Sequence, residues 1–273
     1  MTARANNTQA SKQTIEDLMR IKTALESAVE ILKDYTPGDI AARDKGGGDP
    51  VTEADERVDA ALKKALLRTG EGWLSEETAD SPERLNMSRV WVVDPLDGTR
   101  EFVAGIPEWS VSVGLVVDGK PTAGGIVNPQ TGEFVLGSIE TGITYNGEPA
   151  GPSPIRSLDG AEVLASRSEV KRGEWEQYAD QPFTVRPTGS VAYKLALVAA
   201  GKTGATWTLS PKNEWDIAAG VALVQAGGGF VTELDGSEPV FNQKDPLRSG
   251  LIAGPQGVRA EIESLLKPII AGL

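Results

Sequence analysis

The chain has 273 residues and a formal net charge of −12, and it contains neither Cys nor His. The lack of these two residue types excludes disulfides, thiolate nucleophiles, imidazole bases and the common zinc sites. Any catalysis must therefore use carboxylates, hydroxyls, Lys, Arg, backbone amides and hard metal ions. Because binding to a phosphate backbone depends on Lys and Arg, the acidic balance also argues against a nucleic-acid polymer as partner.

The composition, with 40% hydrophobic and 24% charged residues, is that of an ordinary globular protein. Spanning a bilayer would need an apolar run of about 18 residues, and the sequence has none. The first residues also lack the apolar segment of a secretory signal. We therefore expect a cytoplasmic protein without a membrane partner. The sequence excludes neither a monomer nor a homodimer.

Two helices are predicted near the start of the chain. Apolar residues at helical spacing predict the first from Thr14 to Tyr35, with Thr14 and Asp17 in positions typical of a capping box. A glycine run at 46–48 predicts a mobile loop. The apolar pattern that follows predicts a second helix, which ends near Gly70.

Strands are predicted next. The short apolar run 90–93 is typical of a buried strand, and we expect it to stop at Asp94. Apolar residues then alternate at period two between 109 and 137, with turn residues at 118–119 and 128–132. This pattern predicts an antiparallel meander.

The second half of the chain alternates strands with helices. Strands are predicted near 162–165, 183–185, 205–209, 229–232 and 251–253, and helices near 173–179, 190–200, 216–225 and 256–270. Pro and Gly in the segment EPAGPSP, residues 148–154, indicate a boundary. We therefore predict an N-terminal α+β domain over 1–150 and a C-terminal α/β domain over 151–273.

Four acidic segments carry the candidate chemistry: DPVTEAD (49–55), SEET (75–78), DPLDGT (94–99) and NEWD (213–216). Helix capping alone can explain some of these acidic residues without any functional role. Asp55 stands at capping-box spacing from Thr52, and a carboxylate such as Asp216 is favoured at a helix N-terminus. DPLDGT is harder to explain in this way. It presents two carboxylates, a hydroxyl and free amides beyond a buried strand, where α/β folds build their sites.

The two carboxylates of DPLDGT, Asp94 and Asp97, repel each other unless a cation lies between them. Oxygen ligands select a hard cation, so Mg²⁺ is the natural choice and Mn²⁺ an alternative. Such a cation would also allow an acidic protein to hold a phosphate. These residues therefore predict a divalent metal site that is able to hold a phosphate.

The motifs DPVTEAD, SEET, DPLDGT and EWDIAAG, in this order, resemble the inositol monophosphatase superfamily of Mg²⁺-dependent, lithium-sensitive phosphatases, which includes the 3'(2'),5'-bisphosphate nucleotidases. The similarity runs from about Asp49 to Gly229. It implies an α/β (α+β) fold built as a layered αβαβα sandwich, with an antiparallel sheet in the N-terminal half and a mixed sheet in the C-terminal half. The first half would carry most of the metal ligands.

The resemblance implies two or three metal ions and a ligand set. Glu76, Asp94 and the carbonyl of Leu96 would hold a first ion, and Asp94, Asp97 and Asp216 would hold a second. Asp94 would therefore bridge the two ions.

The resemblance also implies the catalytic groups. Thr99, oriented by a hydrogen bond to Asp55, would act with Glu76 to activate a water molecule, and amides at Gly98 and Thr99 would hold the phosphate. Two-metal hydrolysis lowers the pKa of the attacking water and stabilises the leaving oxygen. The lack of His and Cys is therefore no obstacle.

The segment after DPLDGT resembles the bisphosphate nucleotidase branch, because Arg100 is followed by Glu and Phe. A cation there, together with Lys212, would suit a second phosphate, although Arg100 could equally be an exposed helix residue. The inositol branch often has an acidic residue where this chain has Leu209. The leading prediction is therefore hydrolysis of adenosine 3',5'-bisphosphate to AMP, with inositol 1-phosphate or a sugar phosphate as the alternative.

Two further segments resemble family segments that border the substrate, namely 166–168 and 188–190. Gly189 and Ser190 open a predicted helix whose N-terminus could receive anions, although turn and N-cap chemistry explains such residues too, and we favour it for Ser168. Tyr193 and Trp207 could stack on an adenine, but aromatic residues in a helix and a strand are more often core.

Two rival functions remain at this point. Haloacid dehalogenase-like phosphatases form an aspartyl phosphate on a D-x-D-x-T motif, but the spacing from Asp94 to Thr99 is one residue longer. The second rival, from another class, is a metal-binding regulatory protein without turnover, because a fold does not determine a function.

Overall fold

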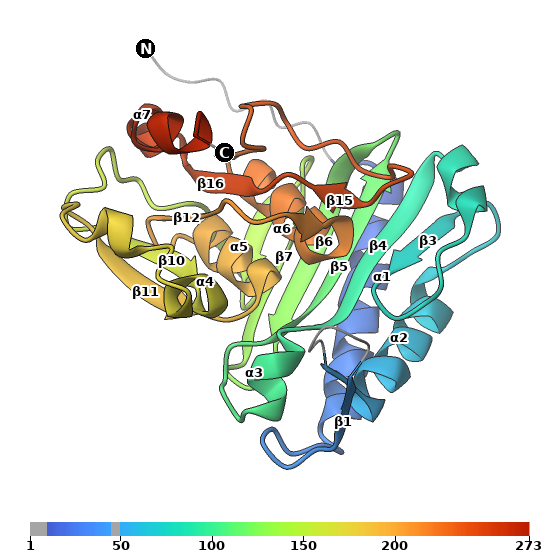
Figure 1. The fold of residues 1–273 in the computed structure, drawn as a ribbon. Helices are drawn as coiled ribbons and strands as arrows, with labels where there is room; N and C mark the ends of the chain where they lie inside the picture. The colour runs from blue at the N-terminus through green and yellow to red at the C-terminus, as the bar shows by residue number, and fades with distance from the viewer. Residues whose placement is uncertain (1–9, 45–49, 273) are drawn as a thin grey trace.

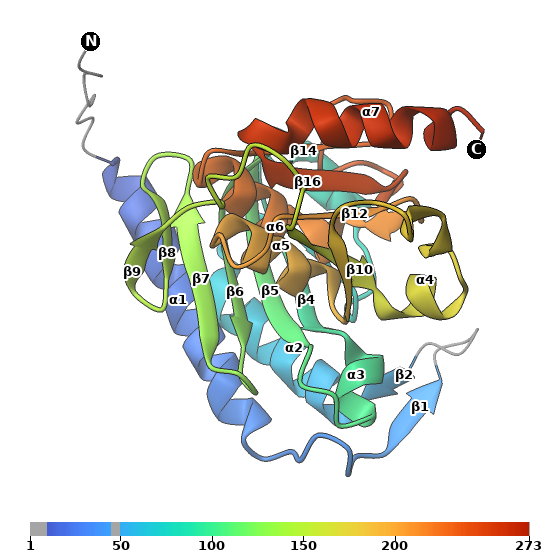
Figure 2. The same ribbon diagram turned by 90° about the vertical axis from the view of Figure 1, so that its left-hand side faces the viewer.

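The structure is a computed structural model, and it describes residues 10–44 and 50–272. The predicted glycine loop at 46–48 and Asp49 of the first acidic motif lie outside the described residues. Figures 1 and 2 show five layers, in which two sheets alternate with helices. This arrangement confirms the predicted layered sandwich.

The outer layer on one side consists of α1 (Lys12–Leu32) and α2 (Glu53–Leu66). Both helices are amphipathic, and their apolar faces cover the larger sheet. Helix α1 begins earlier than predicted, because Ser11 is its N-cap and accepts a hydrogen bond from the Thr14 N–H at 3.1 Å.

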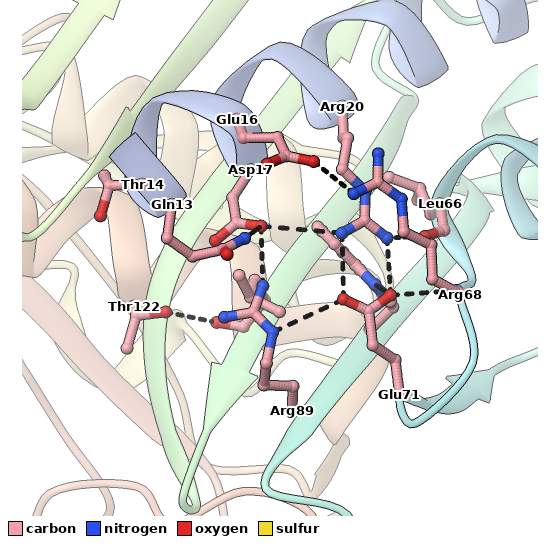
Figure 3. Close-up of polar contacts among 12 residues, drawn as sticks. Gln13, Thr14, Glu16, Asp17, Arg20, Leu66, Arg68, Glu71, Arg89 and Thr122 are labelled. Atoms are coloured by element: carbon pink, nitrogen blue, oxygen red, sulfur yellow. Dashed lines mark hydrogen bonds and ion pairs between the residues drawn. The ribbon is translucent and has the colours of Figure 1, made fainter. Parts of the chain in front are cut away.

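The predicted capping box of Thr14 and Asp17 is wrong. Since the helix begins at Lys12, Asp17 lies inside it and faces the sheet, where its carboxylate pairs with Arg89 at 2.7 Å (Figure 3). The local spacing was compatible with a cap, but burial and a distant arginine decide the role of this side chain.

The larger sheet has seven strands in chain order: β3 (Gly72–Ser75), β4 (Arg89–Asp97), β5 (Ser110–Val117), β6 (Lys120–Asn128), β7 (Glu133–Ser138), β8 (Gly142–Tyr145) and β9 (Glu148–Ala150). It is antiparallel except for the β3–β4 pair. The predicted meander is therefore confirmed as β5, β6 and β7. The pattern analysis missed β3, β8 and β9, which are too short for an alternation to stand out.

Strand β4 extends further than predicted. It does not stop at Asp94 but runs through Pro95 to Asp97, with an irregular register against β5 between the two aspartates. Pro95 cannot donate a ladder hydrogen bond, yet pairing resumes when Asp97 meets Ser110. Gly98 then takes a left-handed conformation (φ 95°) and leads into the short helix α3 (Thr99–Val103).

The second sheet is mixed, as predicted. Its strand order is β11 (Thr184–Thr188), β10 (Glu162–Ser166), β12 (Ala205–Thr208), β16 (Leu251–Pro255) and β14 (Gly229–Thr232). Strand β10 is parallel to both of its neighbours, whereas β16 is antiparallel to both of its own. The small pairs β1 (Ala42–Asp44) with β2 (Pro50–Thr52) and β13 (Lys212–Asn213) with β15 (Leu247–Arg248) complete the strands of the described chain.

The remaining helices are α4 (Arg167–Lys171), α5 (Val191–Ala199), α6 (Glu214–Ala226) and α7 (Arg259–Ile270), with short 3₁₀ segments at Pro82–Asn86, Glu176–Tyr178 and Gln256–Val258. The helix predicted over 173–179 is wrong, because only one 3₁₀ turn forms there. Trp175 and Tyr178 instead pack with Trp207 in an aromatic cluster, so contacts with a distant strand override the local pattern.

Helix α6 lies directly on the larger sheet. A Cβ added to Gly114 in β5 would come within 2.8 Å of the Ala219 N atom, and one added to Gly124 in β6 within 2.7 Å of the Ala219 carbonyl oxygen. The backbones of the helix and the sheet can therefore approach only because both positions are glycine. This contact places the first turn of α6, with Asp216, near the end of β4.

The middle layer joins the two halves of the chain. Helices α5 and α6 lie between the sheets (Figure 2), and one apolar cluster includes Val92 of the first sheet, Val224 of α6 and Val231 of the second. The strands of the two sheets lie on either side of residue 150, but the division into two domains stays a prediction. None of the helices in the described part of the chain has the length and apolarity that a membrane crossing requires.

Candidate active site

A cavity of about 290 Å³ lies where the ends of β3, β4 and α3 meet the first turns of α5 and α6. Residues far apart in the sequence therefore meet at one place. Of the residues predicted from the sequence, it is lined by Glu76, Asp94, Leu96, Asp97, Gly98, Thr99, Arg100, Gly189, Ser190, Lys212 and Asp216. Asp55, the remaining one, lies one hydrogen bond behind Thr99.

Asp94 is the most unusual of the acids because its side chain is almost completely buried, with 1% exposure. Burial raises its pKa well above the ordinary value, and the negative charges of Glu76, Asp97 and Asp216 raise it further. Its Oδ1 accepts a hydrogen bond from the Leu96 N–H at 3.0 Å. No Lys or Arg of the described residues forms an ion pair with it.

Asp97 is held by the start of α5. Its Oδ2 accepts hydrogen bonds from the Ser190 hydroxyl at 2.7 Å and from the Ala192 N–H at 2.6 Å. Burial raises the pKa of Asp97, and these bonds and the charge of Lys194 oppose the rise. The expectation that this N-terminus is open to a substrate anion is corrected, because an aspartate of the chain already occupies it.

Asp55 makes both of the contacts expected from the sequence, the capping box with Thr52 and the hydrogen bond with Thr99. Its Oδ2 accepts hydrogen bonds from the N–H and the hydroxyl of Thr52 at 2.9 and 2.5 Å, which forms the capping box of α2. Its Oδ1 lies 2.9 Å from the Thr99 hydroxyl, which is also 3.0 Å from the Leu96 carbonyl. Burial raises the pKa of Asp55, while the bonds from Thr52 and Thr99 oppose that rise.

Asp216 stands in the first turn of α6, where its Oδ2 accepts the Asn213 N–H at 2.9 Å in a second capping box. Burial raises its pKa well above the ordinary value, and Asp97 and Glu76 raise it further. These acids offer oxygen donors that suit Mg²⁺. As the side chains stand, however, no three acidic groups among residues 10–44 and 50–272 are arranged to hold a metal ion.

The cations around the cavity differ in their surroundings. Arg100 is exposed on α3, whereas Lys212 is mostly buried and lies 3.8 Å from the buried carboxylate of Glu169. Arg167 reaches the cavity and binds Glu108 through two hydrogen bonds of 2.6 and 2.8 Å. The Ser168 hydroxyl lies 2.9 Å from the Ser166 hydroxyl in the turn that opens α4, but both residues also line the cavity, so a turn role for Ser168 stays a prediction.

The sequence reasoning missed three residues of the site. Lys194 and Glu101 line the cavity, and Glu108 accepts hydrogen bonds from Arg167 and from the Gly189 N–H. Lys194 is 3% exposed on α5 and lines the cavity. A signal existed, because a single lysine in the apolar run VAYKLALVA has no obvious place in a buried helix. Tyr193 and Trp207, by contrast, do not line the cavity: the first donates its hydroxyl to Glu133 and the second packs against Trp175, which confirms them as core.

Comparisons with known proteins agree with this architecture. The sequence model of the inositol monophosphatase family matches residues 15–269. An inositol-1-monophosphatase of Mesorhizobium japonicum is 33% identical over 239 residues, which cover 83% of this chain and 86% of that protein. The Nus factor SuhB of Escherichia coli is 28% identical over 259 residues, covering 90% and 93%. The structure of the inositol monophosphatase of Thermotoga maritima superimposes with a TM-score of 0.80 at 26% identity, covering 94% and 98%.

The fold and the match together define a metal-dependent phosphatase. The chain belongs to the inositol monophosphatase family. The aspartyl-phosphate mechanism of the haloacid dehalogenase-like enzymes is thereby set aside, since the family match covers almost the whole described chain.

Proposed function

We propose that this protein hydrolyses a small phosphomonoester with the help of Mg²⁺. The ligands would be the carboxylates of Glu76, Asp94, Asp97 and Asp216 and the carbonyl of Leu96, with two or three ions and with Mn²⁺ as a substitute. The observation that supports this most is the buried Asp94 carboxylate, which shares one cavity with three other acids. Such a set is unfavourable without a counter-charge.

The reaction would depend on Thr99, because its hydroxyl can donate to Asp55 Oδ1 at 2.9 Å and so turn a lone pair towards the cavity. That lone pair would accept the hydrogen bond of an attacking water, and Glu76 would help to remove the proton. The amides of Gly98 and Thr99 would hold the phosphate at the start of α3. A bound divalent cation supplies a lowered pKa for the water and stabilises charge on the leaving oxygen.

The leading substrate is inositol 1-phosphate. The inositol-1-monophosphatase of Mesorhizobium japonicum covers most of this chain at 33% identity. This support reverses the order of substrates favoured by the sequence alone. The cytoplasmic location stays a prediction.

Adenosine 3',5'-bisphosphate is the second candidate, and a specific observation favours it. Lys212 lines the cavity with its ammonium group near Glu169, and Leu209 stands where the inositol branch often has an acid. A second phosphate would find a cation there, whereas an inositol ring would find no carboxylate from residue 209 for its hydroxyls.

A substrate panel with Mg²⁺ tests the proposal. Release of phosphate is measured from inositol 1-phosphate, a sugar phosphate and adenosine 3',5'-bisphosphate, in the wild type and in Lys212→Met. We expect kcat/KM to be highest for inositol 1-phosphate. Lys212→Met is expected to lower kcat/KM for the bisphosphate about 10-fold and to leave inositol 1-phosphate within about 2-fold.

The matched control is Lys171→Met, which removes an exposed lysine of α4 that does not line the cavity. Preference of the wild type for the bisphosphate would exchange the two candidates. If no ester of the panel were hydrolysed, the protein would be a non-catalytic metal-binding regulator instead.

A further inference from the structure

Lys194 is buried at a position where a positive charge is expected to destabilise the fold. It is the fourth residue of α5, and its side chain is 3% exposed. A cation is unfavourable near a helix N-terminus, where the backbone dipole is positive, and removing an ammonium group from water adds to the cost. Burial indeed lowers the pKa of Lys194, although the charges of Asp97 and Glu169 oppose this effect.

The ammonium group binds the backbone of the turn that precedes its own helix. Its Nζ donates to the Ser190 carbonyl at 3.0 Å and to the Thr188 carbonyl at 3.3 Å. In the part of the chain that the structure describes, it makes no ion pair with a carboxylate. Lys194 therefore connects the two residues on either side of Gly189.

The turn at 188–190 has a conformation that needs such support. Ser190 has φ 55°, in the region that a residue with a side chain rarely adopts. In this conformation its hydroxyl donates to Asp97 Oδ2 at 2.7 Å and accepts the Tyr193 N–H at 2.9 Å. The Ala192 N–H reaches the same Asp97 oxygen at 2.6 Å.

The opposite side of the turn is fixed as well. The Gly189 N–H donates to Glu108 Oε2 at 2.8 Å, and Arg167 holds that carboxylate. A Cβ at position 189 would come within 2.5 Å of the Glu101 Cγ and of the Glu108 carbonyl oxygen, so the turn has no room to shift in that direction. Lys194 supplies the support from the helix side.

We infer that Lys194 is a positioning residue: it holds the 188–190 turn so that Ser190 and Ala192 orient the Asp97 carboxylate for the divalent cation. The inference rests on the proposed function, because Asp97 matters in this way only if it is a metal ligand. Lys194 acts through the turn and not by contact with the substrate. The stability lost by burying the Lys194 ammonium group is then the cost of orienting Asp97 for the cation.

The test is Lys194→Met, which keeps the length and the apolar stem of the side chain but removes the charge and the donors. We expect the dissociation constant for Mg²⁺ to rise about 10-fold, or about 1.4 kcal/mol. It is measured by calorimetry and by the Mg²⁺-dependent increase of Tm. The Tm of the metal-free variant should be unchanged or higher, because a buried charge is removed.

Ser190→Ala provides a second variant should Lys194→Met not fold. It removes the hydroxyl that donates to Asp97 and is expected to weaken Mg²⁺ binding in the same direction. If Lys194 acts through the turn, the fold-loss of Mg²⁺ affinity in the double variant will be smaller than the product of the fold-losses in the two single variants. Lys171→Met serves as the control with unchanged binding.

The outcomes separate this inference from the proposed function. If the wild type itself binds no Mg²⁺ in calorimetry, the proposed function fails. If the wild type binds but Lys194→Met binds equally well or more tightly, the lysine only opposes the cation by its charge and the inference is overturned. A lower metal-free Tm with unchanged Mg²⁺ affinity would show a structural role and would overturn it as well.

Discussion

Two groups of acids, each with buried members, lie in different parts of this molecule, and their negative charge is compensated in opposite ways. In the arginine network at one end of α1, Asp17 and Glu71 are paired with Arg20 and Arg89 (Figure 3). Arg20 lies 2.6 Å from Glu71, Arg89 lies 2.7 Å from Asp17, and the Trp91 indole N–H donates to Glu71 at 2.9 Å. The cavity acids Glu76, Asp94, Asp97 and Asp216 form the other group.

The two groups differ in how their charge is compensated. Burial alone would raise the pKa of Glu71, but hydrogen bonds from Arg20 and Trp91 bring it below the ordinary value. Burial raises the pKa of Asp94 too, and there the neighbouring acids add to the rise. In the arginine network, which serves the stability of the fold, Arg20 and Arg89 of the chain itself supply the positive charge. Asp94 forms no ion pair with a Lys or Arg of the described residues, so a cation from outside would be needed to compensate its charge.

The largest effect is expected from Asp94→Asn. Removing the proposed bridging charge should lower kcat/KM by about 10³-fold or more, because every cation site that includes Asp94 loses a charged ligand. The metal-free Tm should be equal or higher, since repulsion among the cavity acids falls. Phosphate release and thermal unfolding in EDTA measure the two quantities, and near-normal turnover would refute the assignment.

Arg20→Met should have the reverse profile. It leaves Glu71 buried without its closest cation, so we expect a loss of about 3 kcal/mol in the free energy of unfolding, with kcat within about 2-fold. Lys22→Met is the matched control on the same helix, because its pair with Glu26 is more than half exposed and should contribute less than about 1 kcal/mol. Equal losses in both variants, measured by urea unfolding, would contradict the comparison.

The smallest effect concerns pH. Groups with a raised folded pKa, such as Asp94 and Asp216, stabilise the fold below their ordinary pKa, and this contribution is lost as the pH rises through the folded value. Glu71, with a lowered pKa, contributes in the opposite sense and loses its contribution as the pH falls below the ordinary value.

For the metal-free protein we therefore expect Tm to decline as the pH rises above about 4, the ordinary pKa of an Asp carboxyl, because the unfolded chain then ionises more readily than the folded one. Saturating Mg²⁺ should flatten this decline, because the cation favours the charged carboxylates. Scans in EDTA and in Mg²⁺ measure the difference, and parallel curves would argue against metal binding at these acids.

The sequence predicted different parts of this molecule for different physical reasons. The alternating pattern of β5 to β7 could be predicted because periodicity is a local property, whereas the layered fold was expected from the family resemblance. The residues of DPLDGT themselves predicted a metal site at Asp94 and Asp97, but that Glu76 and Asp216 join them was expected from the resemblance alone, since no local rule brings these segments together. Their roles as ligands stay a proposal.

Other features could not be predicted because they depend on distant partners. The spacing of Thr14 and Asp17 suited a cap, but Arg89, far along the chain, determines where Asp17 points. The start of α5 was expected to be free for anions, yet Asp97 occupies it. Lys194 carried the only local signal, a charge inside an apolar helix.

The close contact between α6 and the two glycines of the sheet has a consequence for the ion selectivity of the proposed metal site. Gly114 and Gly124 do not line the cavity, but they determine how closely Ala219 approaches the sheet. Asp216 stands on that helix, whereas Asp94 stands on β4, so a side chain added beneath α6 would widen the gap between them. Mg²⁺ demands short and nearly ideal octahedral bonds, while Ca²⁺ accepts longer ones. If Asp94 and Asp216 are ligands, as proposed, a methyl group added at Gly114 or Gly124 would thus change which ion size is accepted without altering any of the proposed ligands.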